Sequence, residues 1–125
     1  MANNYKFTGV VLTTTDETAL LTAASTETII IRSIRVTNNT SNTPTISMDV
    51  SDNSASTEYT ILKTQTLAAN TAVEILSVPL VLEASDALKA TISSSDSIHF
   101  GISYMSITWL HNIWFQVKVL TKFGV

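Results

Sequence analysis

Apolar side chains recur at every second position through most of this chain, and that spacing limits what it can fold into. Residues 98–104 read IHFGISY, residues 46–50 read ISMDV, and residues 88–92 read LKATI. Such alternation places apolar side chains on one face of a β-strand and polar or small ones on the other. No window of about 11 residues or more shows a 3.6-residue stripe, and the best helix candidate, 16–24, is short and rich in Thr. The chain is therefore predicted to be all-β.

Turn-forming clusters separate the apolar runs. The clearest are residues 38–44 (NNTSNTP) and 51–56 (SDNSAS). We expect strands near residues 5–12, 18–23, 28–37, 44–51, 57–63, 72–77, 79–83, 87–93, 97–109 and 113–121. In the third of these, Ile30, Ile34 and Val36 share one parity, interrupted by Arg32, which predicts that all three face the same side.

Many short strands at this spacing are typical of a sandwich, a jelly roll or a barrel. We expect one antiparallel, jelly-roll-like β-sandwich domain over residues 1–108, because 125 residues fit a single domain. A C-terminal hydrophobic extension, an aromatic strand or arm, follows over residues 109–125.

The composition limits the classes of partner that this chain is expected to bind. The formal net charge is −3, with no basic run of the kind that binds nucleic acid, so no nucleic-acid partner is expected. No run approaches the roughly 18 apolar residues that cross a bilayer, so no membrane partner is expected either. Only 14% of residues are charged, and 20 Thr and 15 Ser take their place. A hydroxyl-rich surface of this kind favours assembly, or simply belongs to a Thr-rich β protein; the composition leaves both open.

The residues that usually carry chemistry are scattered. His99 and His111 do not have zinc-ligand spacing, and the three glycines, Gly9, Gly101 and Gly124, cannot form a phosphate loop. There is no cysteine. Loop carboxylates are the remaining candidates for calcium, and we expect them to be solvated turns instead: Asp16 with Glu17, Asp49 with Asp52, and Glu83 with Asp86. We therefore expect no catalytic site, no metal, no cofactor and no enzymatic activity.

The C-terminal segment 109–125 differs from the rest, because it holds both tryptophans and no acidic residue. Its apolar residues alternate with Gln116 and Lys118, which suits a strand added to the sheet edge of a neighbour. The alternative is an ordinary last strand of its own sandwich, and the sequence leaves both open. The candidate interface residues are Trp109, Ile113, Trp114, Phe115, Val117, Val119 and Phe123.

Four segments carry a family resemblance: 12–23, 27–38, 67–76 and 79–90. Within them, residues 67–74 read LAANTAVE and residues 82–89 read LEASDALK. Over residues 9–107 the pattern resembles small β-sandwich virion proteins of tailed bacteriophages, especially of marine and cyanobacterial hosts. Residues 109–125 depart from that pattern.

The resemblance implies a virion structural role without catalytic residues. The first expectation is a capsid decoration (cement) protein that packs at subunit seams, made in the host cytoplasm and located in the virion. Its partners would be other virion proteins, such as major capsid or neck and tail proteins, and further copies of itself, for example in a trimer. The alternative is a head, neck or tail fibre or appendage that binds carbohydrate, with Tyr5, Tyr59 and Tyr104 as candidate contacts.

Overall fold

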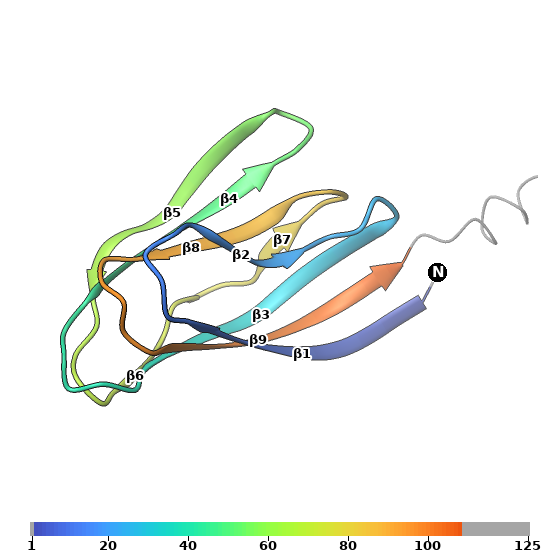
Figure 1. Ribbon diagram of the computed structural model, residues 1–125. Helices are drawn as coiled ribbons and strands as arrows, with labels where there is room; N and C mark the ends of the chain where they lie inside the picture. The colour runs from blue at the N-terminus through green and yellow to red at the C-terminus, as the bar shows by residue number, and fades with distance from the viewer. Residues whose placement is uncertain (1, 109–125) are drawn as a thin grey trace, which may run out of the picture.

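The computed structural model describes residues 2–108, in which Figure 1 shows only strands and connecting loops. The strands are β1 (Ala2–Leu12), β2 (Thr18–Thr22), β3 (Glu27–Asn38), β4 (Thr45–Asp52), β5 (Thr57–Thr66), β6 (Ala72–Glu74), β7 (Leu80–Leu82), β8 (Ala87–Ile92) and β9 (Ile98–Thr108). Each of the first nine predicted strands has a counterpart here, and the helix candidate 16–24 contains β2. The predicted strand 113–121 lies outside the described residues. No helix that could span a membrane occurs within residues 2–108.

The strands form two antiparallel sheets that face each other (Figure 1). One sheet has the order β1-β9-β3-β6, with β7 also paired to β3, and the other has the order β2-β8-β4-β5. Strands β6 and β7 pair with different parts of β3, so together they occupy one position beside it. With that position counted once, the strand order is that of a jelly roll. The prediction of an all-β, antiparallel sandwich is confirmed.

The core lies between the two sheets. The predicted alternation of β9 holds, since Ile98, Phe100 and Ile102 are at most 2% exposed. The other large, fully buried side chains come from both sheets and are Ile29, Ile31, Ile34, Ile46, Met48, Leu82, Leu88, Ile92 and Val36. Burial of each large apolar side chain contributes roughly 1.5–3 kcal/mol to stability. This apolar layer holds the two sheets together in a chain without cysteine.

A β-bulge changes which side chains of β3 face the core. The pairing of β3 with β9 shifts after Ile31, which leaves Arg32 as an extra residue. Because one extra residue reverses the side-chain alternation, Ile31 and Ile34 are both fully buried. The prediction that Ile30 shares a face with Ile34 and Val36 is therefore wrong. Ile30 points away from the core and is half-buried.

The carboxylate of Glu74 fills the gap that this bulge leaves beside β3. Strand β7 pairs with β3 before the bulge and β6 pairs with it afterwards. Between them, Glu74 accepts hydrogen bonds from the Ser33 hydroxyl and, at 2.8 Å, from the Ile34 N–H. Burial alone would raise the pKa of Glu74, but these bonds, the Leu76 N–H and the charge of Arg35 lower it below its ordinary 4.5. The carboxylate thus replaces part of the strand ladder.

Asn38, at the end of β3, is fully buried and ties two loops together. Its Nδ2 donates to the carbonyl oxygens of Asn42 at 2.7 Å and of Leu67 and Ala68 at 3.2 Å. Its Oδ1 accepts from the N–H and the hydroxyl of Thr40, at 3.1 and 2.7 Å. The side chain therefore satisfies backbone groups in the loops that follow β3 and β5, and the segment 38–44 is a turn as predicted.

Candidate protein interaction surface

Strand β1 turns its aromatic side chains away from the core. Tyr5 is 77% exposed and Phe7 is 69% exposed. Lys6, between them, pairs with Tyr104 and so lies on the inward face of the sheet. A strand beside a core usually has the reverse pattern, with apolar side chains inward and polar ones outward. Exposed rings in a regular strand therefore make β1 a candidate for part of an interaction surface.

The apolar character continues across the sheet in one row. The register places Tyr5 beside Met105, Met105 beside Ile30, and Ile30 beside Val81. Val81 is 50% exposed, as is Val11 further along β1, whereas Met105 and Ile30 are half-buried. This outward side of β1, β9, β3 and β7 is called the outer face below. It gathers most of the large exposed apolar side chains of the described residues.

A pair of glycines lines a shallow depression in the outer face. Gly9 of β1 and Gly101 of β9 lie opposite each other, with the ring of Phe7 over them. A Cβ on Gly101 would lie 3.2 Å from Cε1 of Phe7. A shallow depression of about 410 Å³ lies next to this ring, bordered by Phe7, Val11 and His99. Glycine within a strand often marks the close approach of another group, and here that group is the ring of Phe7. The depression beside the ring has room for a protruding apolar side chain.

Positive charges border the apolar centre. Arg35 lines the glycine depression, and Arg32, the bulge residue, lines a second hollow beside Tyr5 and Phe7. Both arginines are exposed, and Arg35 pairs across the ladder with Glu74. An apolar centre with a polar, charged rim is the usual composition of a protein–protein interface.

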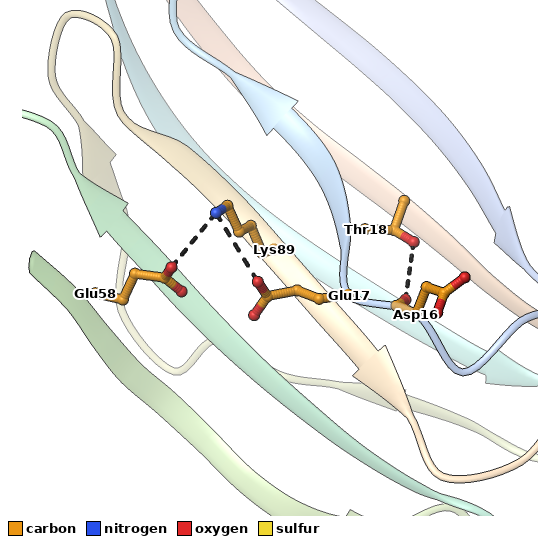
Figure 2. Close-up of polar contacts among 5 residues, drawn as sticks. All are labelled: Asp16, Glu17, Thr18, Glu58 and Lys89. Atoms are coloured by element: carbon orange, nitrogen blue, oxygen red, sulfur yellow. Dashed lines mark hydrogen bonds and ion pairs between the residues drawn. The ribbon is translucent and has the colours of Figure 1, made fainter.

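The outward side of the other sheet is polar instead. Lys89 of β8 lies between two carboxylates, with its Nζ 3.5 Å from Oε2 of Glu58 and 3.9 Å from Oε1 of Glu17 (Figure 2). Asp49 of β4 pairs directly with Lys89 and its carboxylate joins the same cluster. Partial burial and the charge of Glu58 raise the pKa of Glu17 above its ordinary 4.5, against the opposing effect of Lys89. Lys89 is thereby paired with carboxylates of its own chain.

The fold regroups the loop carboxylates that the sequence pairs. Asp49 and Asp52, expected together, belong to different clusters, whereas Glu83 and Asp86 do come together, with Asp52 beside them. Asp86 is 4% exposed and accepts hydrogen bonds from the N–H groups of Asn53 and Glu83, each at 2.9 Å. This carboxylate therefore anchors a turn. Asp16, by contrast, uses its backbone carbonyl to accept a hydrogen bond from the Thr18 hydroxyl (Figure 2).

The remaining candidates do not form a common site. His99 lies on the exposed side of β9, as predicted, with Nε2 3.3 Å from the Ser97 hydroxyl. The tyrosines considered for sugar binding are separated: Tyr5 is on the outer face, Tyr59 is on β5 of the other sheet, and Tyr104 packs against the core. His111 lies outside the described residues.

All of the predicted interface residues lie outside the described residues as well: Trp109, Ile113, Trp114, Phe115, Val117, Val119 and Phe123. The outer face was not found from the sequence. In the sequence, the outer face is represented by residues 5–8 (YKFT), which alternate like those of any other strand. Only the pairing with β9 decides that its aromatic parity faces outward.

Comparison with known proteins shows similarity of fold to solved structures, at low sequence identity. No protein-family model matches this chain, and no curated protein does. The solved structure of infectious bursal disease virus, Gx strain, matches 87% of this chain with a TM-score of 0.54 and 12% identity, and this chain spans 33% of the viral chain. The Drosophila NLP-core matches with a TM-score of 0.49 and 17% identity, over 82% of this chain and 98% of that one. The cyanophage Pam1 capsid asymmetric unit matches with a TM-score of 0.43 and 16% identity, over 82% and 84%. At such identities, the first likeness shows a β fold shared with a virus structure.

Proposed function

We propose that this chain is a structural protein of a virus particle, and specifically a capsid decoration (cement) protein that stabilises the head by packing at subunit seams. The observation that carries the proposal is the outer face, where Tyr5 and Phe7 are exposed in a regular strand. The fold shared with a virus structure supports it. The resemblance of residues 9–107 to phage virion proteins supports it independently.

The polar clusters of the described residues also favour a structural role. The Glu74 carboxylate completes the ladder of β3, and the buried Asp86 anchors a turn. Lys89 is engaged by Glu17 and Glu58. Each of these side chains is bonded to other groups of the same chain. This arrangement favours a non-enzymatic role.

The proposed partners are other virion proteins and further copies of this chain, for example in a trimer within the virion. A stable interface buries roughly 1,200–2,000 Å² in total. The outer face would contribute one part of that area. Residues 109–125 would contribute another, with Trp109, Trp114 and Phe115 as anchors, because aromatic residues dominate the energetics of interfaces.

The solution test is the oligomeric state of the full chain, measured by size-exclusion chromatography with light scattering over a range of concentrations. We expect an oligomer, and we expect the double substitution Tyr5→Ser/Phe7→Ser to raise the concentration for half-assembly tenfold or more. The control is Tyr59→Ser, which removes a 53% exposed ring from the other sheet. A chain that stays monomeric throughout would contradict the proposal.

The location test is cryo-electron microscopy of intact particles that contain this chain. Density at the seams between capsid subunits is the expected result. Density on the neck or tail would overturn the decoration role in favour of a fibre or appendage. Absence of the chain from purified particles would overturn the virion role altogether.

A further inference from the structure

The edges of the two sheets differ in their capacity to accept another strand. The edge strands β6 and β7 have three residues each. Strand β2 has five residues and a bulge, and β5 pairs irregularly with β4 and contains a positive φ at Thr64. Short or bulged edges are the usual protection against unwanted pairing. Strand β1, by contrast, is an edge of 11 residues that pairs with β9 without a register shift, and Lys6 is its one charged residue.

This long, regular edge and the apolar surface coincide. The outward apolar side chains of β1 are Tyr5, Phe7 and Val11, and the glycine depression begins at Gly9 of the same strand. A strand added along β1 would continue the sheet, and its outward side chains would lie beside these rings. Backbone hydrogen bonds would then supply affinity, and the depression would supply selectivity for an apolar side chain.

The chain itself contains a segment with the required pattern. The 17 residues after Thr108 hold Trp109 and Trp114, and Phe115, Val117 and Val119 occur at strand spacing. A segment of that length reaches at most about 60 Å when extended, more than the roughly 37 Å spanned by 11 strand residues. It is therefore long enough to leave one copy and lie along β1 of another.

The topology favours a second copy over the same one. Strand β9 is flanked by β1 on one side and β3 on the other, so the segment after Thr108 cannot return as a hairpin beside β9. Thr108 pairs with Ala2, at the start of β1. To lie on its own β1, the segment would have to cross that strand and run parallel to it, which is the weaker pairing.

We propose that residues 109–125 of one copy add as a strand to the β1 edge of a second copy, with an aromatic side chain seated in the Gly9–Gly101 depression. This inference rests on the proposed assembly function, and it identifies β1 as the strand to which the segment of another copy is added. Reciprocal exchange of two segments would close a two-fold dimer, and sequential exchange would give a ring or an open filament.

The test is photocrosslinking in the full chain, with benzoylphenylalanine in place of Phe115. An equimolar mixture of ¹⁵N-labelled and unlabelled copies is assembled, irradiated, digested and sequenced by tandem mass spectrometry. We expect mixed-isotope crosslinks to residues 2–12 or to the glycine depression. Crosslinks confined to one copy would overturn the second-copy assignment, and mixed-isotope crosslinks elsewhere would overturn β1 as the acceptor.

A matched pair of substitutions completes the test. Phe7→Lys places a charge on the outer face and should reduce the mixed-isotope crosslinks at least tenfold, whereas Tyr59→Lys, on the edge strand of the other sheet, should leave them unchanged. Equal loss in both variants would overturn the inference. An oligomer that persists without crosslinks to β1 overturns this inference alone, while a chain that never assembles overturns the proposed function as well.

Discussion

Replacing Asn38 with Asp tests how much the buried junction between the two loops contributes to stability. The side chains have nearly the same shape, but Asp offers no N–H₂ group to the carbonyl oxygens of Asn42, Leu67 and Ala68. Each lost hydrogen bond contributes about 1 kcal/mol, so the loss should be about 3 kcal/mol or more. For a chain of 125 residues, that lowers the melting temperature by about 9–18 °C.

The pH dependence gives the prediction a second readout. Burial among carbonyl oxygens raises the folded-state pKa of the introduced carboxyl, because its charged form is disfavoured there. The deficit should therefore be largest above that pKa and should shrink as the pH falls, when the carboxyl regains a proton to donate. Calorimetry and urea unfolding at several pH values measure both effects. The control is Asn39→Asp at the exposed neighbouring position; equal losses at the two positions, without pH dependence, would refute the reasoning.

Three further substitutions test the polar groups. Glu74→Gln should lower stability by only about 1 kcal/mol at pH 7, since the wild-type carboxylate is substantially exposed. Because the pKa of Glu74 is lowered, its contribution to stability is present above pH 4.5 and is lost on further acidification. The urea unfolding curves of the two proteins should therefore converge at acidic pH. Lys89→Met leaves Glu17 among like charges, so the pKa of Glu17, followed by NMR, should rise further and the loss in melting temperature should diminish in high salt. Asp86→Ala leaves the Asn53 N–H without its acceptor and should cost about 1–3 kcal/mol in urea unfolding. An unchanged Glu17 titration, or a parallel acid profile in Glu74→Gln, would contradict these assignments.

Periodicity predicted the strands well because it records burial, and burial repeats along each strand. It failed at Ile30 because one inserted residue, Arg32, reverses the parity of everything after it. No local pattern distinguishes a bulge from an ordinary polar position. The hydrophobic alternation of β9 contains no such insertion, and its inward residues were predicted correctly.

The candidate surface was harder to predict, because it depends on residues far apart in the sequence. Gly9 and Gly101 look like isolated small residues until the pairing of β1 with β9 brings them together. The carboxylates show the same limit: Asp49 and Asp52 were predicted as neighbouring loop carboxylates, but Asp49 lies within β4 and the strand pairing places the two in different clusters. Local sequence specifies strands and turns, whereas the register between strands decides which side chains share a face.

The apolar nature of Tyr5, Phe7 and Val11 also determines how an assembly built on the outer face would respond to temperature. Association through such side chains has a small enthalpy near room temperature and a large negative heat-capacity change, so it weakens on cooling and strengthens in sulfate or phosphate. Charge-based contacts respond in the opposite way to added salt. Particles held together at this face would therefore loosen when chilled, and would tolerate concentrated salt.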